Sequence, residues 1–213
     1  MWTEHGKANP NVGGSRMRVA VFTDIHVNVD ALRRILSSIR KNKIDKTIFL
    51  GDVFFRGDNV KECIDLLIEE NIICIAGNCE LYFQKGVEID PDVIKDKDYY
   101  DQMRCMLPGK YVEWVKHLDK EILIQANGHK IYLAHFLMQD RGLSYPYYPL
   151  ASLTDGSFDG AIIGNPYDLM IFGHSHQKFV KGNVISVPAA GMGKPEYLIV
   201  DIENEVNYEW AAD

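Results

Sequence analysis

The sequence is poor in cysteine and in positive charge, and it lacks long apolar runs. No two of its 4 cysteines form a CxxC motif, so we expect reduced thiols rather than a disulfide framework. Lysine and arginine number 23 against 30 acidic residues, and the net charge of −7 argues against a general affinity for nucleic acid or anionic lipid. No apolar stretch approaches the roughly 20 residues of a membrane-spanning helix, and residues 1–16 have no signal-peptide core. These absences predict a cytoplasmic protein.

The composition is that of a globular protein with a substantial core. The chain has 213 residues, of which 46% are hydrophobic and 25% charged. Residues 1–16 are polar and rich in turn-forming types, and we expect them to form a flexible leader. Residues 17–213 are expected to form a single domain.

Apolar runs alternate with amphipathic segments in the first half of the chain. The pattern predicts strands at 18–23, 47–50 and 72–76, and helices at 29–41 and 59–70. This βαβαβ order implies neighbouring parallel strands with helices packed against the sheet.

The second half carries hairpin signals. Asn127-Gly128 separates the apolar segments 121–125 and 130–134, and Gly182-Asn183 separates 179–181 from 184–187, so we expect mainly antiparallel strands. Between the two halves, aromatic and apolar residues recur at helical spacing from about 90 to 118, with an interruption at Pro108-Gly109. This region is expected to be a helical insertion.

Metal-competent side chains follow the predicted strands, at positions that line the crevice of an open α/β sheet. The first strand leads into Asp24 and His26, and we expect an extended backbone to point both side chains the same way. The next two strands end in Gly51-Asp52 and Gly77-Asn78, where each glycine is expected to let the backbone turn sharply. The spacing therefore predicts that oxygen and nitrogen ligands gather at one edge.

Three more histidines complete this set. His135 ends a later strand, and His174 and His176 follow another. A mixture of carboxylate, amide and imidazole suits two divalent cations roughly 3.5–4 Å apart, with Asp52 as the bridge. Such a pair lowers the pKa of a shared water, so that hydroxide is available near neutral pH. Ligand softness leaves Mn, Fe, Zn, Ni and Co as candidates.

The complete pattern, from Met17 to about Asp201, resembles the calcineurin-like metallophosphoesterase superfamily. The short chain and the Gly77-Asn78-Cys79-Glu80 segment are similar to its small bacterial and archaeal group. The resemblance implies an α/β fold, a two-sheet β-sandwich flanked by helices in α-β-β-α order, and it favours manganese. It also implies that one metal is held by Asp24, His26 and His176, the other by Asn78, His135 and His174, and that Asp52 is shared.

Two positions depart from the pattern of this superfamily. Cys79 stands where many members have a histidine that helps to protonate the leaving group, so we expect a preference for esters whose leaving group departs without a proton. His135 lies in Ala134-His135-Phe136, without the flanking glycine that is common in the family. Arg56 resembles an arginine that contacts substrate phosphate in some relatives; a surface charge is the alternative interpretation.

The sequence thus predicts a metal-dependent phosphoesterase that hydrolyses phosphate mono- or diesters of small substrates by metal-activated hydroxide. Asp52, Asn78 and His135 are placed at its catalytic centre. One alternative is a nucleotide or dinucleoside polyphosphate hydrolase, or a protein phosphatase, of the same fold; a segment with Tyr145, Tyr147 and Tyr148 would suit base stacking. Another alternative is a non-catalytic scaffold, and the intact ligand set argues against it.

Overall fold

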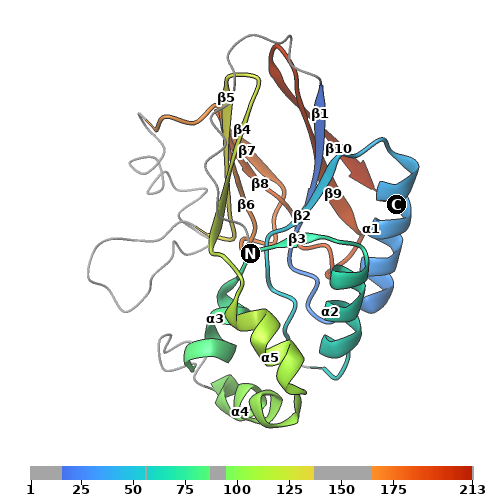
Figure 1. The fold of residues 1–213 in the computed structure, drawn as a ribbon, viewed down its shortest axis with the longest axis vertical. Helices are drawn as coiled ribbons and strands as arrows, with labels where there is room; N and C mark the ends of the chain where they lie inside the picture. The colour runs from blue at the N-terminus through green and yellow to red at the C-terminus, as the bar shows by residue number, and fades with distance from the viewer. Residues whose placement is uncertain (1–15, 56, 87–94, 137–164, 213) are drawn as a thin grey trace.

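The computed structural model describes residues 16–55, 57–86, 95–136 and 165–212, which form two five-stranded sheets with helices (Figure 1). The first sheet consists of β1 (Met17–Phe22), β2 (Lys46–Phe49), β3 (Ile73–Cys74), β9 (Glu196–Ile202) and β10 (Val206–Ala212). The second consists of β4 (Glu121–Ala126), β5 (His129–Ala134), β6 (Leu169–Phe172), β7 (Phe179–Lys181) and β8 (Val184–Ser186). The strand orders are β10-β9-β1-β2-β3 and β4-β5-β6-β8-β7. The predicted two-sheet sandwich is confirmed.

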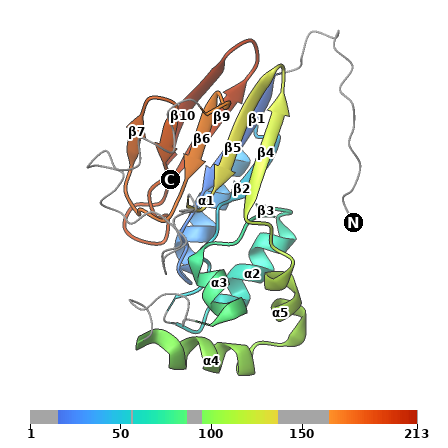
Figure 2. The same cartoon turned by 90° about the vertical axis from the view of Figure 1, so that its left-hand side faces the viewer.

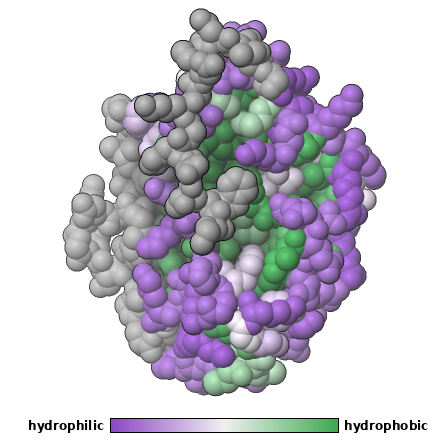
Figure 3. All heavy atoms as spheres, viewed as in Figure 1, coloured by the Kyte–Doolittle hydropathy of each residue, from purple (hydrophilic) through white to green (hydrophobic). Residues whose placement is uncertain are grey.

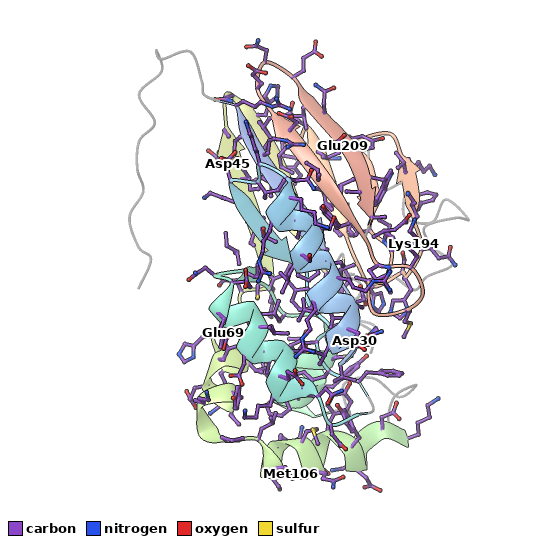
Figure 4. The ribbon with its side chains drawn as sticks, turned by 90° about the vertical axis from the view of Figure 1, so that its right-hand side faces the viewer. Asp30, Asp45, Glu69, Met106, Lys194 and Glu209 are labelled. Atoms are coloured by element: carbon purple, nitrogen blue, oxygen red, sulfur yellow. The ribbon has the colours of Figure 1, made fainter. Side chains whose placement is uncertain are left out.

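The first sheet has the predicted parallel core. β1, β2 and β3 are parallel neighbours, and β9 pairs antiparallel with the free side of β1. Helices α1 (Val29–Lys41) and α2 (Val60–Glu69) cover its outer face; Figure 4 shows Asp30 at the start of α1 and Glu69 at the end of α2. Asn28 caps α1 by accepting a hydrogen bond from the backbone N–H of Ala31 at 3.0 Å.

The second sheet is mixed, so the expectation of mainly antiparallel strands was wrong in part. The β4–β5 and β7–β8 hairpins are antiparallel, as their turn signals indicate, but β6 is parallel to both β5 and β8. Turn residues specify pairing only between strands that follow one another closely. β6 is fully buried between the two hairpins, where a parallel strand normally lies.

Alternate residues of β1 face two different cores. Val19 and Val21 pack between the sheets with residues such as Leu133 of β5, whereas Ala20 and Phe22 pack against the helices. This follows from the two-residue period of a strand that is buried on both faces. Apolar surface shows through along the middle of the face drawn in Figure 3, where the two sheets meet.

Three further helices lie together at one end of the sandwich (Figure 2). They are α3 (Asn78–Lys85), α4 (Lys97–Met106) and α5 (Gly109–Lys116), and the last two fall where a helical insertion was expected. The predicted leader lies outside the described residues, apart from Arg16. None of the helices within the described ranges has the length and apolar character needed to span a membrane.

Candidate active site

The side chains proposed as metal ligands converge where strands of both sheets end. Asp24 and His26 follow β1, Asp52 follows β2, and Asn78 begins α3 after β3. From the second sheet, His135 follows β5, and His174 and His176 follow β6. The structure brings all seven together, at the carboxyl ends of parallel strands where α/β proteins bind ligands.

Asp24, His26 and His176 form one side of this cluster. Oδ1 of Asp24 lies 3.1 Å from Nε2 of His176 and 3.5 Å from Nε2 of His26, and the two ring nitrogens are 3.1 Å apart. Asp24 is fully buried, whereas the His176 side chain is 38% exposed. One oxygen and two nitrogens thus face a common point that is open to solvent on one side.

Asn78, His135 and His174 form the other side. Oδ1 of Asn78 lies 3.0 Å from Nε2 of His135 and 2.8 Å from Nδ1 of His174. The His135 ring is buried. Again one oxygen and two imidazole nitrogens converge, which matches the second ligand group that the family resemblance implies.

Asp52 lies within reach of both sides. One of its carboxylate oxygens lies within 4.8 Å of donor atoms of Asp24 and His135, and one lies as close to donor atoms of His26 and Cys79. Oδ1 of Asp52 is 3.5 Å from Nε2 of His135. This central position is the one that a bridging carboxylate requires.

The hydrogen bonds that His26 and His135 make through Nδ1 are compatible with metal binding through Nε2. Nδ1 of His26 lies 3.1 Å from the carbonyl of Phe54, and Nδ1 of His135 lies 2.9 Å from that of Leu50. A carbonyl only accepts, so each Nδ1 carries a proton, and Nε2 is the atom that faces the cluster and would bind a metal ion in place of its own proton. Within the described part of the chain, no donor makes a hydrogen bond to the buried Oδ1 of Asp24. Converging imidazole nitrogens and a carboxylate oxygen without a hydrogen bond form an arrangement that a metal cation would satisfy.

The electrostatics of the cluster favour positive charge. Burial would lower the pKa of His26 and His135, but Asp24 and Asp52 outweigh it and raise both pKa values to about 9. Burial and the neighbouring His135 lower the pKa of His174 to about 4. The carboxylates therefore attract a cation, and His174 remains a neutral donor.

The backbone at the cluster differs from the expected extended form. Five of the proposed ligands have left-handed backbone angles, namely Asp24, His26, Asp52, His174 and His176, with φ between 45° and 64°. The argument from an extended strand was therefore wrong, although Asp24 and His26 do lie together. Tight turns bring them together, and Val27 shares the left-handed form at φ 55°, which is unusual for a β-branched residue.

The two glycines that precede Asp52 and Asn78 serve mainly to let their strands approach. Gly51 turns sharply at φ 101°, as expected, but Gly77 has an ordinary φ of −89°. A Cβ on Gly51 would lie 2.3 Å from the backbone nitrogen of Gly77, and a Cβ on Gly77 would lie 2.2 Å from Oδ1 of Asp52. Space, rather than conformational freedom, is what Gly77 provides.

Cys79 binds the Asp52 carboxylate. Its backbone N–H donates to Oδ1 at 2.9 Å, and its thiol donates to Oδ2 at 3.2 Å. Burial, assisted by the charge of Asp52, raises the pKa of the Cys79 thiol well above its usual value. The thiol therefore stays protonated and orients Asp52.

Glu80 is a site residue that the sequence interpretation did not assign. It is fully buried, and its carboxylate accepts the backbone N–H groups of Asp52 and Gly77 at Oε2 and of Val53 at Oε1, over 2.7–2.8 Å. Burial and the charge of Asp52 raise the pKa of Glu80 to about 6. Its position three residues after the helix N-cap is the signal that could have identified it, because glutamate there often reaches back to the cap.

A cleft of about 130 Å³ opens over the cluster. Beside the candidate ligands it is lined by the aromatic residues Phe55, Tyr82, Tyr99 and Tyr100. Arg56, proposed to contact phosphate, lies outside the described residues, as do Tyr145, Tyr147 and Tyr148.

The fold is a two-sheet α/β sandwich, and its clustered carboxylate and imidazole groups could hold metal ions. The chain belongs to the calcineurin-like phosphoesterase family, whose sequence profile matches residues 17–178. Membership confirms the resemblance seen in the sequence and supports a phosphoesterase, in a family that depends on metal ions.

Similar proteins extend this picture. An uncharacterised protein of Methanocaldococcus jannaschii is 29% identical over 178 residues, which are 78% of this chain and 67% of that protein. A metallophosphoesterase of Sphaerobacter thermophilus has a TM-score of 0.60 at 19% identity, covering 92% of this chain and 88% of its own. A hypothetical protein of Pyrococcus horikoshii has a TM-score of 0.65 at 16% identity, covering 92% and 87%. The two solved structures share the fold.

Proposed function

We propose that the protein is a dinuclear metal-dependent phosphoesterase, with Mn²⁺ as its preferred ion. One observation carries the proposal: two groups of ligand atoms converge on either side of a single buried carboxylate, Asp52. Asp24, His26 and His176 would hold one ion and Asn78, His135 and His174 the other. At such a site, a pair of divalent cations supplies water activation near neutral pH and neutralises charge on the phosphoryl oxygens.

The residues of this chain orient and support those ligands. The carbonyls of Phe54 and Leu50 fix the ring planes of His26 and His135, so that the Nε2 lone pairs are directed inward. Cys79 fixes the Asp52 carboxylate through two hydrogen bonds. In the overall reaction, the oxygen of a water forms a bond to phosphorus, the bond to one ester oxygen breaks, and the departing alcohol or phenol takes up a proton.

Removal of metal is expected to abolish hydrolysis. An aryl phosphate ester should be hydrolysed by the purified protein, lose that activity on treatment with a chelator and regain it with Mn²⁺. Metal analysis of protein purified without chelator should find close to two ions per chain. Full activity in excess chelator would contradict the mechanism, whereas a chain that binds no metal would favour the scaffold interpretation.

The pKa of the leaving group is expected to control the rate. The Cys79 thiol is buried and donates its hydrogen bond to Asp52, so we do not expect it to protonate the leaving group. In a series of esters, kcat should fall steeply as the pKa of the leaving group rises. Replacement Cys79→Ala should change all rates by a similar factor and leave the slope unaltered. A steeper slope in the variant would show that the thiol protonates the leaving group, an effect typically worth about 10²–10⁴ in rate. A flat series in the wild type would assign that proton to another group.

We also propose that the protein acts in the cytoplasm on small phosphate esters. Four free thiols suit a reducing compartment, and the net charge of −7 gives no general affinity for nucleic acid or anionic membranes. Electrophoretic mobility shifts with DNA and RNA, together with vesicle sedimentation, would test this; tight binding at physiological salt would contradict it.

A further inference from the structure

A second cavity, of about 380 Å³, adjoins the candidate metal centre at His135. Its volume falls in the range of roughly 300–1,000 Å³ that is typical of small-molecule sites. The cleft over the metal ligands, at about 130 Å³, is well below that range. A substrate larger than a phosphoryl group therefore needs additional space, and this cavity provides it.

Helix α3 separates the two cavities. Leu81 lines the second cavity, whereas Cys79 and Tyr82 of the same helix line the metal cleft. The cavities approach each other at the start of α3: Oδ1 of Asn78, a residue that lines the cleft, lies 3.0 Å from Nε2 of His135, a residue that also lines the second cavity. A phosphorus atom at the metal centre would thus lie next to both spaces.

The second cavity has a preformed aromatic wall. Tyr132 lines it, and its ring is stacked on that of Tyr167 with the centroids 5.0 Å apart and the planes inclined by 20°. The Tyr132 hydroxyl donates to Glu121 at 2.6 Å. The ring is therefore held in place before a ligand arrives, which lowers the entropic cost of binding.

A second ring belongs to the cavity lining and also contacts two of the candidate metal ligands. Phe136 lines the cavity, and its ring meets those of His135 and His174 edge-on, at centroid distances of 5.6 and 5.7 Å. The remaining lining consists of the small or apolar residues Ala76, Leu81 and Ala134 and the charged residues Lys120 and Glu121. Two aromatic rings with apolar residues beside them favour a flat ring as the ligand.

We propose that this cavity binds one ester substituent of a phosphodiester, a planar ring, while the phosphorus lies at the metal centre. The inference rests on the proposed function and narrows it from phosphate esters in general to ring-bearing diesters. The other substituent would leave through the cleft, whose wall of Phe55, Tyr99 and Tyr100 is also aromatic.

Two substrates with the same leaving group test the proposal. They are para-nitrophenyl phosphate, a monoester, and bis(para-nitrophenyl) phosphate, a diester with a second ring. Replacement Tyr132→Ala should lower the diester-to-monoester ratio of kcat/KM about tenfold, because a ring contact and its buried area are lost only for the diester. Since both rates come from one preparation, the ratio does not depend on the fraction of folded protein.

Matched variants separate the ring from other effects. Tyr132→Phe keeps the ring and removes only the hydrogen bond to Glu121, so the ratio should stay within about twofold of the wild type. Leu123 is the cross-strand partner of Tyr132; it is 46% exposed and does not line the cavity. Replacement Leu123→Ala should therefore also preserve the ratio. Leu81→Trp fills the cavity from α3 and should lower the ratio, as Tyr132→Ala does.

An unchanged ratio in both Tyr132→Ala and Leu81→Trp would overturn the proposal. Binding of diphenyl phosphate, a diester with a poor leaving group, keeps the test independent of turnover. Calorimetric titration should show affinity for the wild type and at least about tenfold weaker affinity for Tyr132→Ala. Binding that depends on Tyr132 in a protein without metal-dependent hydrolysis would reject the proposed function and retain the subsite. Metal-dependent hydrolysis with binding that does not depend on Tyr132 would retain the proposed function and reject the subsite.

Discussion

Replacement Asp52→Asn is expected to lower kcat/KM for an aryl phosphate at least about 100-fold, because even groups that only support metal ligands are commonly worth 10–100-fold. Asp52 is buried between the two ligand groups, so loss of its charge should weaken the binding of both ions of the proposed pair. The amide oxygen of asparagine can still accept the Cys79 N–H, and the fold should be retained. Steady-state kinetics at saturating Mn²⁺, metal analysis and circular dichroism would measure these effects.

Asp30→Asn provides the matched control. It makes the same chemical change and the same change in net charge, on the exposed first turn of α1 (Figure 4). Its activity and metal content should equal those of the wild type. Near wild-type turnover of Asp52→Asn at saturating metal would show that Asp52 does not bridge two ions.

Replacement Glu80→Ala is expected to reduce the free energy of unfolding by about 3 kcal/mol or more. The change leaves the buried N–H groups of Asp52, Val53 and Gly77 without their acceptor, and an unsatisfied buried donor typically costs about 1–3 kcal/mol. Urea denaturation followed by fluorescence would give the value. Activity should fall as well, since these bonds hold the turns that carry Asp52 and Asn78.

Two variants make this result specific. Glu80→Gln keeps one oxygen, which can accept the two N–H groups at Oε2, and should lose less stability than the alanine variant. Glu62→Ala removes an exposed glutamate of α2 that pairs with Arg33 at the surface, and should leave the unfolding midpoint nearly unchanged. Equal midpoints for Glu80→Ala and the wild type would show that the three N–H groups find other partners.

The elements with strong local signals were predictable from the sequence. Helix α1 has the predicted bounds, 29–41, because an amphipathic pattern follows the N-cap Asn28, and the β4–β5 hairpin surrounds Asn127-Gly128 as expected. The strand pair β9–β10 was not predicted. Strand β9 lies beside β1 through pairs such as Met17 with Ile202, which are far apart in the chain and which no local pattern encodes.

At the site, the sequence indicated which residues gather but not how they do so. Apolar strands that end in Asp, Asn or His predicted the cluster, because the carboxyl ends of parallel strands meet at one edge. The left-handed turns at Asp24 and His26 were missed, since the extended form was the simpler expectation. The role of Glu80 was also missed: its bond to Gly77 has a local signal, but its bonds to Asp52 and Val53 join residues that are distant in the chain.

The left-handed turns restrict which amino acids the site can accept over evolutionary time. Asp, Asn and His tolerate positive φ better than most other residues, and they are also good metal donors. A glutamate or cysteine at Asp24 or His174 would meet a conformational penalty before any change in coordination was felt. Only a few amino acid types can therefore be used at these positions to change a metal preference. Exchanges among Asp, Asn and His change mainly the coordination of a metal ion. Other substitutions also add the conformational penalty of the left-handed turn.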